Sequence, residues 1–414
     1  MMSNSIRVNE LRQKLEEAYS VGVIESIESM ACDEEELLRS VTSRPEAQNL
    51  GASNELRSSF LVVAESGKYF LKRVSDWIEE EQLACIEHFI NWTGQQRLNL
   101  SAALIGTRTG GTHIRLGEIR YQLFEFVEQE KRQLWMKAEL TEQDCSLAGQ
   151  LLIKFIEATC QYLECRQRAE DGNSFPRPQD WKSSAIRKTK ENWNLLLARA
   201  GAAGNNADPA IARLLNAQNL LEEKLEHSLR LALSAEDAIM QAGLTCFVHG
   251  DFHPGNILFS FDENSRRTAR LVDYDHMHRE FSAFDMGYAL IMFAYSPSLH
   301  NGQTQSKADI DQGRAQAFIR GALQSLFGND DDRTETQVVR PDLLKSSGGE
   351  LIVAYMTLSC FLIVDWAEER LRNGPPPFSS IYAGIIADMT DLLLGDSLEK
   401  TGLFYSQVRN EILS

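Results

Sequence analysis

The chain has 414 residues, of which 43% are hydrophobic and 24% are charged, and its formal net charge at pH 7 is −17. This length and composition predict an ordinary soluble protein that is large enough for two lobes with their own cores. The negative charge argues against broad nucleic-acid binding, because phosphates would be repelled and no basic run is longer than the two residues of Arg266-Arg267. We therefore expect no nucleic-acid partner.

Targeting and redox signals are weak along the whole sequence. The N-terminal residues 1–7 lack the basic head and apolar core of a secretory signal, and the best apolar runs, 290–295 and 361–364, are far shorter than a membrane span. The seven cysteines are odd in number and scattered, which favours buried reduced thiols over a disulfide framework or a zinc site. We expect a cytoplasmic protein with no membrane partner.

In the first third of the chain, the spacing of apolar residues changes at about residue 46 from a helical pattern to the alternation that is typical of strands. Residues 1–45 carry spaced apolar positions among many acids, which predicts an N-terminal extension of two or three short helices. Residues 60–63 and 69–74 then alternate around Gly67 and predict a hairpin. A helix over 76–92, N-capped by Ser75, and a second strand pair follow, the latter at 112–116 and 121–127. Residues 46–127 are predicted to form a small antiparallel β-rich lobe.

The remaining residues, 128–414, are dominated by helical periodicity. Helices are predicted over 146–162, 181–200, 211–242, 283–294, 315–327, 349–372 and 378–394. Two short apolar segments, 245–248 and 269–272, interrupt them and are predicted to pair as a β-hairpin around a polar loop. The fold class is therefore α+β, with a small β-rich N-terminal lobe and a larger, mostly helical C-terminal lobe.

The polar loop carries the chemistry. Residues 248–258 read Val-His-Gly-Asp-Phe-His-Pro-Gly-Asn-Ile-Leu, and 271–275 read Leu-Val-Asp-Tyr-Asp. Each of Asp251, Asn256 and Asp273 is by itself an ordinary turn residue. Their conjunction supplies what phosphoryl transfer needs, one oxygen to accept a hydroxyl proton and two to hold magnesium. Asp275 lies on the same face of an extended chain as Asp273, so it is a second candidate metal ligand and also a candidate for contact with the substrate.

These two motifs resemble those of the aminoglycoside phosphotransferase and choline kinase family, small-molecule relatives of the protein kinases. The resemblance implies a bilobal protein-kinase-like fold, with Asp251 as catalytic base and with Asn256 and Asp273 as magnesium ligands. It also implies that His249 holds the loop and that Asp285, in Ala-Phe-Asp-Met-Gly-Tyr, braces it. Asp285 also reads as an acid that satisfies free amides at a helix N-terminus, which is compatible with that role.

The resemblance requires a phosphate-binding lysine in the small lobe. Lys72, in Phe-Leu-Lys-Arg on the strand after the hairpin, fits this position. Its partner should be a helix glutamate, and Glu79, Glu80 and Glu81 compete for the role. We favour Glu79, because it shares a helical face with the apolar positions of the predicted helix, Leu83, Ile86 and Ile90.

Two further segments are similar to nucleotide-binding parts of these enzymes. Gly-Ala-Ser-Asn at 51–54 resembles the loop that covers the phosphates, which implies contacts from Ser53 and Asn54, although no full Gly-x-Gly-x-x-Gly is present. Glu125, Phe126 and Val127 leave the last strand of the small lobe and resemble the hinge that binds adenine through its backbone. Relatives often carry a histidine in the helix around 152–157; this chain has none there.

The substrate side is less specific. Asp365 and Trp366 could form an acidic, aromatic wall for an amine-bearing alcohol, and a solvated helix face is the simpler alternative. The predicted function is an ATP- and Mg²⁺-dependent transfer, GTP being possible, to a hydroxyl of an amino alcohol, amino sugar or sugar. The alternatives are a nucleotide-binding scaffold, a protein kinase, which His-Gly-Asp and Asp-Tyr-Asp disfavour, and a non-enzymatic helical interaction protein. The oligomeric state is left open.

Overall fold

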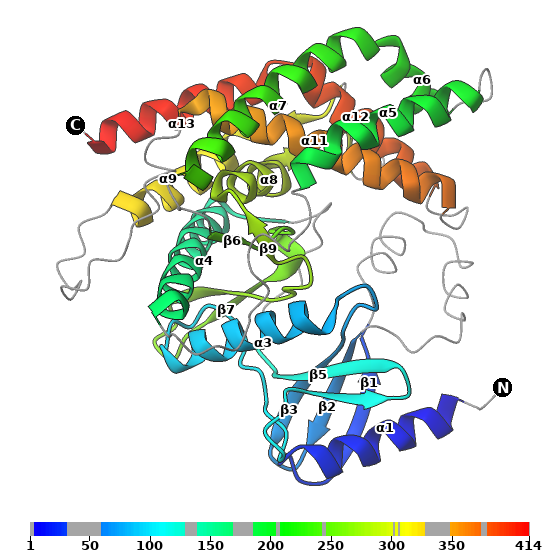
Figure 1. The fold of residues 1–414 in the computed structure, drawn as a ribbon, viewed down its shortest axis with the longest axis vertical. Helices are drawn as coiled ribbons and strands as arrows, with labels where there is room; N and C mark the ends of the chain where they lie inside the picture. The colour runs from blue at the N-terminus through cyan, green and yellow to red at the C-terminus, as the bar shows by residue number, and fades with distance from the viewer. Residues whose placement is uncertain are drawn as a thin grey trace. The chain divides into compact units, whose positions relative to one another are not determined.

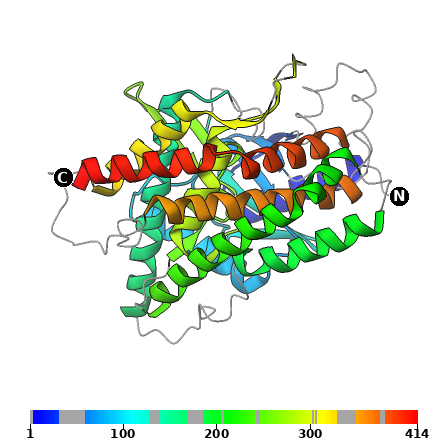
Figure 2. The same ribbon diagram turned by 90° about the horizontal axis from the view of Figure 1, so that it is seen from above.

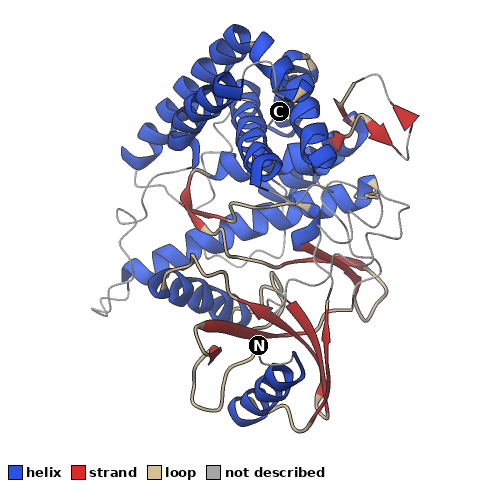
Figure 3. Cartoon of the chain, turned by 90° about the vertical axis from the view of Figure 1, so that its right-hand side faces the viewer, coloured by secondary structure: helices blue, strands red, loops and turns tan. Residues whose placement is uncertain are grey.

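The computed structural model describes residues 4–30, 59–128, 139–168, 185–203, 208–241, 246–300, 303–304, 307–327, 348–373 and 379–413. The chain divides into two compact units. The first contains Met1–Leu134, Asn173–Pro176 and Gly255–Asp275, and the second contains Trp135–Gly172, Arg177–Pro254 and His276–Ser414. Figure 3 shows the sheet of the first unit in red and the helices that make up most of the second unit in blue.

The first unit is built on a five-stranded sheet in the order β1-β2-β3-β5-β4, with every neighbouring pair antiparallel. The strands are β1 (Ile24–Ser29), β2 (Ser59–Ala64), β3 (Gly67–Arg73), β4 (His113–Leu116) and β5 (Ile119–Glu125). Both predicted hairpins of this region are confirmed. Gly67 and Gly117 stand at their turns with φ of 139° and 61°, which glycine adopts at little cost.

The two faces of this sheet have different coverings, because alternate side chains of a strand point to opposite faces. One face packs with α1 (Asn4–Ala18) through a core that joins Leu11 and Leu15 to Val62 and Leu71. The other face carries Lys72 and its neighbours and meets α3 (Glu80–Gln95). Figure 1 shows α1 and α3 on opposite sides of the sheet.

The prediction of two or three short helices in the N-terminal extension is partly wrong. Within the described residues 4–30, α1 is the one helix, and residues 24–29 form the edge strand β1, which pairs with β2. The apolar side of α1 lies in the same core as the sheet, so these residues are part of the first unit. Ser75 is also not the N-cap of the next helix. Glu79 holds that position, and Ser75 Oγ donates to Asp275.

The predicted pairing of segments 245–248 and 269–272 is wrong. Each pairs with another strand, β6 (Cys246–Val248) with β9 (His278–Glu280) and β7 (Ile257–Phe261) with β8 (Arg267–Leu271). The cause is a tight turn between β7 and β8, in which the Asp262 carboxylate accepts the amides of Asn264 and Arg266 at 2.9 and 2.8 Å. A hairpin between strands that are close in sequence costs little loop-closure entropy, and it gives the backbone groups of each strand a hydrogen-bonding partner.

The second unit is mainly helical. Its longer elements are α4 (Glu142–Arg168), α5 (Ala185–Ala203), α6 (Pro209–Asn216), α7 (Gln218–Gln241), α8 (Ser282–Ala294), α9 (Gln312–Phe327), α11 (Gly349–Asn373), α12 (Ser379–Leu394) and α13 (Ser397–Leu413). Two-residue strands β10 (Tyr295–Ser296), β11 (Leu299–His300), β12 (Gln303–Thr304) and β13 (Asp309–Ile310) follow α8. The predicted helices are confirmed, except that 211–242 is split into α6 and α7. Helix α13 was not predicted.

Helix α11 forms the centre of this helical unit. It contacts α5, α7, α8, α12 and α13, and Figure 2 shows α7, α11 and α13 running side by side. Its most apolar window has a mean hydropathy of 1.6, so within the described residues it has the length and composition of a membrane span, which the sequence reading did not find. Because 67% of that window is buried among the neighbouring helices, its apolar character is that of a core helix.

Candidate active site

Lys72 is held between two carboxylates in the first unit. Its Nζ lies 2.8 Å from Oδ1 of Asp273 and also contacts Asp275. The lysine side chain is 13% exposed. Burial works to lower the pKa of Lys72, but the two carboxylates outweigh it and raise the pKa above its ordinary value. Lys72 is therefore a fixed positive charge on the face of the sheet that meets α3.

The two aspartates differ in exposure. Asp273 has a left-handed backbone, with φ of 63°, which aspartate tolerates better than most residues, and its side chain is 42% exposed. Asp275 is 10% exposed, and its Oδ2 accepts a hydrogen bond of 2.6 Å from Ser75 Oγ. Its backbone carbonyl accepts from Gln82 Nε2 at 3.5 Å. Asp273 is thus open to an external cation, whereas Asp275 is committed to contacts within the protein.

Asn256 lies beside the segment that carries Asp273. It ends a single 3-10 turn, Pro254–Asn256, is 7% exposed, and its carbonyl accepts the amide of Val272 at 2.9 Å. A carboxamide and a carboxylate are suitable oxygen ligands for Mg²⁺, which usually takes one or two carboxylates together with phosphate oxygens and water. Across the described ranges no group of three or more His, Cys, Asp or Glu side chains forms a complete metal site. The donors present fit a magnesium ion that arrives with phosphates.

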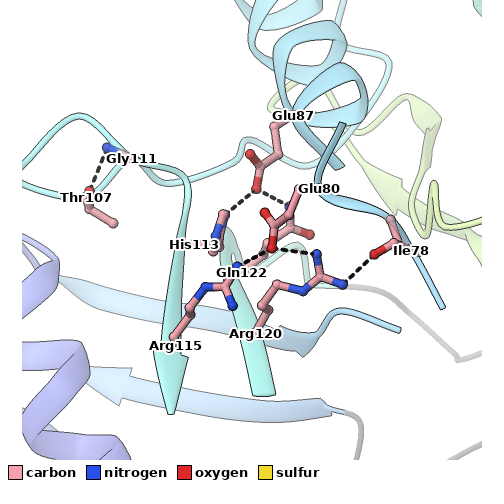
Figure 4. A network of polar contacts seen from close by, with 9 residues as sticks. All are labelled: Ile78, Glu80, Glu87, Thr107, Gly111, His113, Arg115, Arg120 and Gln122. Atoms are coloured by element: carbon pink, nitrogen blue, oxygen red, sulfur yellow. Dashed lines mark hydrogen bonds and ion pairs between the residues drawn. The ribbon is translucent and has the colours of Figure 1, made fainter. Parts of the chain in front are cut away.

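The predicted partner of Lys72 is not where the prediction placed it. Glu79 is the exposed N-cap of α3, while Lys72 contacts Asp273 and Asp275. The buried acid of α3 is Glu87, which accepts hydrogen bonds from Gln122 Nε2 at 2.9 Å and lies 3.1 Å from His113 Nδ1 (Figure 4). Geometry therefore favours Asp275 over Glu79 as the counter-ion of Lys72. The helical spacing used for Glu79 failed because the helix begins one residue after it.

Glu80, another candidate partner of Lys72, forms ion pairs with two arginines. Glu80 Oε1 contacts Arg115 and lies 3.2 Å from Arg120 Nη1, and Arg120 also donates to the carbonyl of Ile78 at 2.6 Å (Figure 4). Arg120 is 8% exposed, so this contact fastens the start of α3 to strand β5. The network fixes the helix against the sheet without using Lys72.

A pocket in the first unit ends at these charged groups. It encloses about 910 Å³ of space, the open solvent at its mouth included. Its apolar walls come from β3, α3, β5 and the β7–β8 hairpin: Phe70, Ile86, Ile90, Phe124, Leu258 and Leu271. Lys72, Asp273 and Asp275 also line it. One lining therefore offers both an apolar slot for a flat ring and charged groups for phosphates.

The predicted hinge residues lie on this pocket. Glu125, Phe126 and Val127 all line it, and the amide of Glu125 donates to the carbonyl of Ala103 at 2.9 Å. The Glu125 side chain contacts Arg270 on β8. The predicted phosphate-covering residues Ser53 and Asn54 lie outside the described residues, and their role stays a prediction.

Asp251 lies in the second unit, where both of its carboxylate oxygens have partners. Tyr288 Oη donates to Oδ1 at 2.8 Å, and His253 Nε2 lies 3.3 Å from Oδ2. Burial by itself raises the pKa of Asp251, but the positive charges of His253, His276 and His249 outweigh it and hold the pKa well below its usual range. The side chain is 27% exposed. Asp251 is thus an ionised, accessible carboxylate.

Asp285 braces the loop that carries Asp251. It is fully buried in the first turn of α8, and its carboxylate accepts the amides of His249 and Gly250 at 2.5 and 3.0 Å. The His249 ring packs edge-on against Phe155 at 6.0 Å. Burial raises the pKa of Asp285 to about 6, against the lowering effect of the two amides. These contacts are those of a structural aspartate and a structural histidine.

Two of the three predicted substrate residues, Asp365 and Trp366, are engaged within the helical unit, and the third, Asp275, contacts Lys72 in the first unit. Asp365 on α11 accepts from Asn192 Nδ2 at 2.9 Å and lies 3.6 Å from Arg199, which also pairs with Glu368 at 2.7 Å. The ring of Trp366 packs edge-on against Tyr382 at 5.5 Å. Arg199 offsets much of the acidic charge, so the wall is less anionic than the sequence indicates. A substrate role for Asp365 and Trp366 stays a prediction.

The family comparison decides what these parts belong to. The model of the phosphotransferase enzyme family matches residues 48–318, more than half of the chain. The chain belongs to the phosphotransferase enzyme family. The matched stretch contains Lys72, Asp251, Asn256, Asp273 and Asp285, and it ends before the helix that carries Asp365. The family prediction made from the two motifs is confirmed, and the protein is a phosphotransferase.

Solved structures of similar fold include other phosphotransferases. An aminoglycoside phosphotransferase from Alicyclobacillus acidocaldarius is 15% identical, with a TM-score of 0.52 over 87% of this chain and 91% of its own. Spectinomycin phosphotransferase, in complex with ADP and spectinomycin, is 12% identical, with a TM-score of 0.56 over 96% and 98%. A microcompartment-associated aminopropanol kinase is 15% identical, with a TM-score of 0.54 over 96% and 99%.

These likenesses confirm the predicted fold class of this phosphotransferase, α+β with a β-rich N-terminal part and a helical, protein-kinase-like C-terminal part. Among curated protein sequences, none matches the chain.

Sequence reasoning missed two residues of the candidate site, Tyr288 and His253. The sequence positions of both residues could have indicated their place in the site. Tyr288 stands three positions after Asp285 and therefore shares its helix face, and His253 stands two positions after Asp251 in the loop.

Proposed function

We propose that this phosphotransferase moves the γ-phosphate of ATP, with Mg²⁺, to a hydroxyl group of a small molecule, with Asp251 as the base. The observation that carries the proposal is the pocket of the first unit. It ends in Lys72 and Asp273 and has apolar walls that continue to the hinge residues 125–127. A nucleotide has the same division, an apolar base and a charged polyphosphate.

Each charged group has a task in this proposal. Lys72 steadies the phosphates as a fixed cation, and Asn256 with Asp273 would hold Mg²⁺ through neutral and anionic oxygens. Magnesium supplies charge neutralisation on the phosphates when it is bound. Asp251 is ionised over the ordinary pH range because its pKa is depressed, so it can orient a hydroxyl and accept its proton. GTP as donor is not separated from ATP by these features.

The acceptor in this proposal is a small alcohol of the amino alcohol, amino sugar or sugar class. Support comes from proteins of similar fold, one solved with ADP and spectinomycin, one named an aminopropanol kinase, and one an amicoumacin kinase solved with AMP-PNP and Ca²⁺. Asp365 and Glu368 would attract an amine only in part, because Arg199 already pairs with both.

Two measurements test the proposal. The first is the melting temperature with ATP and Mg²⁺, with ATP alone, and with neither, because a ligand that binds the folded protein raises it. The second is a γ-phosphate transfer screen over amino alcohols, amino sugars and sugars. We expect stabilisation by ATP with Mg²⁺ and transfer to at least one acceptor in the screen.

Two variants serve as controls for the transfer screen. Asp251→Ala should lose transfer by several orders of magnitude and keep the nucleotide-dependent thermal shift, since Lys72, Asn256 and Asp273 are intact. Asp237→Asn, an exposed position on α7, is the control and should behave like the parent. Full activity in Asp251→Ala would overturn the base assignment. Nucleotide stabilisation without transfer to any acceptor would favour a nucleotide-binding scaffold.

A further inference from the structure

The hydroxyl of Tyr288 is placed to act on Asp251. Its Oη lies 2.8 Å from Asp251 Oδ1, and Tyr288 belongs to α8, whose first turn carries Asp285. Burial and then the negative charge of Asp251 raise the pKa of Tyr288 well above its ordinary value. The phenol is therefore protonated at neutral pH, and it donates its hydrogen to the carboxylate.

The tyrosine itself is fixed. Its ring stacks on Phe284 of the preceding turn, with ring centroids 6.1 Å apart and an interplanar angle of 16°. Asp285, three positions before it on the same helix face, accepts the amides of His249 and Gly250. One turn of α8 thus holds both the backbone before Asp251 and the side chain of Asp251.

The two partners of Asp251 leave it little rotational freedom. Tyr288 on α8 donates to Oδ1, and Nε2 of His253, two residues further along the same loop, lies 3.3 Å from Oδ2. A carboxylate oxygen accepts more than one hydrogen bond, so capacity remains for an incoming hydroxyl. The charged and titratable groups that face it are His253, His276, His249, Asp285 and Tyr288.

We propose that Tyr288 is a positioning residue that fixes the carboxylate of Asp251 in the orientation needed to accept a proton from the acceptor hydroxyl. This inference rests on the proposed function, in which Asp251 is the base. A base that can rotate spends less time aligned with its substrate, and misalignment lowers the rate of the chemical step more than it lowers binding.

The test compares the loss of the hydroxyl group at two tyrosines on contacting helices, Tyr288 on α8 and Tyr355 on α11. Tyr288→Phe removes the donor and keeps the ring that stacks on Phe284. Tyr355→Phe is the control, since Tyr355 on α11 is fully buried and its hydroxyl has no hydrogen-bond partner within the described part of the chain. We expect Tyr288→Phe to lower kcat by about 10-fold or more, with KM for ATP and for the acceptor within about twofold. Tyr355→Phe should leave kcat unchanged.

The outcomes separate this inference from the function it rests on. Unchanged kcat in Tyr288→Phe, beside an inactive Asp251→Ala, overturns the positioning role alone. An active Asp251→Ala overturns the base and the positioning role together. A fall in kcat that comes with a several-degree fall in melting temperature and a loss of ATP stabilisation marks Tyr288 as merely structural, and this also overturns the inference. A lower kcat with unchanged KM and melting temperature supports it.

Discussion

The ammonium of Lys72 lies 2.8 Å from Oδ1 of Asp273, although 201 positions separate the two residues in the chain. One comes from the central strand β3 and the other follows β8, and both belong to the first unit. A buried ion pair costs desolvation, which the second carboxylate, Asp275, and the hydroxyl of Ser75 offset. The cluster places a fixed cation beside the partly exposed carboxylate of Asp273.

Replacing Lys72 by methionine should remove the phosphate-binding charge and leave two carboxylates facing each other. We expect kcat/KM for ATP to fall by about 100-fold or more, because a fixed cation in a partly buried site is worth more than one in water. Steady-state kinetics at saturating acceptor measure it. Lys68→Met is the control, since Lys68 pairs with Glu128 at an exposed position. Equal losses in both variants would contradict the assignment.

Substitutions of Asp275 and Glu79 should have different effects, because only Asp275 of the two contacts Lys72 in the described part of the chain. Asp275→Asn should lower kcat/KM for ATP by about 10-fold, because a neutral amide holds an ammonium less well than a carboxylate does. Glu79→Gln should have the activity of the parent, since Glu79 is exposed at the start of α3. The same kinetic assay decides between them. Loss of activity in Glu79→Gln alone would restore the glutamate predicted from sequence.

Glu87 and Gln122 should be coupled in stability. Glu87→Leu leaves the buried amide of Gln122 without its acceptor, so we expect the free energy of unfolding to fall by about 1–3 kcal/mol. The double variant Glu87→Leu/Gln122→Leu should recover part of this loss, because both members of that hydrogen bond are then gone, although His113 Nδ1 still loses its contact with Glu87. Chemical denaturation of the parent, both single variants and the double variant measures the coupling. Strictly additive effects would contradict it.

Gly250 is required by the backbone of the loop that carries Asp251. Its φ is 78°, and a Cβ there would lie 2.4 Å from the carbonyl oxygen of His276. Gly250→Ala should therefore cost about 1–2 kcal/mol for the left-handed backbone, with the clash in addition, and should reduce transfer. Melting temperature and activity are the measurements. The control is Gly201→Ala, which meets no atom within 4 Å in helix α5 and should be neutral or stabilising.

Asp285 should give the protein a distinctive pH dependence of stability. Its pKa in the folded state is raised by burial to about 6, above the ordinary value of 3.8, so the folded protein holds this proton more tightly than the unfolded chain does. The contribution of that proton to stability is fully present below pH 3.8 and is lost as the pH rises through 6.

The asparagine in Asp285→Asn cannot titrate, so this variant does not lose stability through position 285 as the pH rises. The advantage of the parent over Asp285→Asn in unfolding free energy should shrink as the pH is raised from about 4 to 7. Urea unfolding at several pH values measures both proteins. A constant difference over that range would show that Asp285 does not titrate there.

The local pattern of the sequence predicted most elements because their signals are local. Alternation around Gly67 and Gly117 gave the two hairpins, and long amphipathic or apolar runs gave the helices. Strand partners were predicted less well, since 245–248 and 269–272 each pair elsewhere. An apolar run shows that a strand is buried and does not show which neighbour it takes.

The sequence by itself determined the family, because His-Gly-Asp, Asn256 and Asp273 resemble the family motifs and the family model matches residues 48–318. Only the tertiary structure decided which groups touch. It gave Lys72 the carboxylates Asp273 and Asp275 in place of Glu79, and gave Asp251 the hydroxyl of Tyr288. Such contacts join residues 37 to 203 positions apart, and packing, which local propensity does not encode, brings them together.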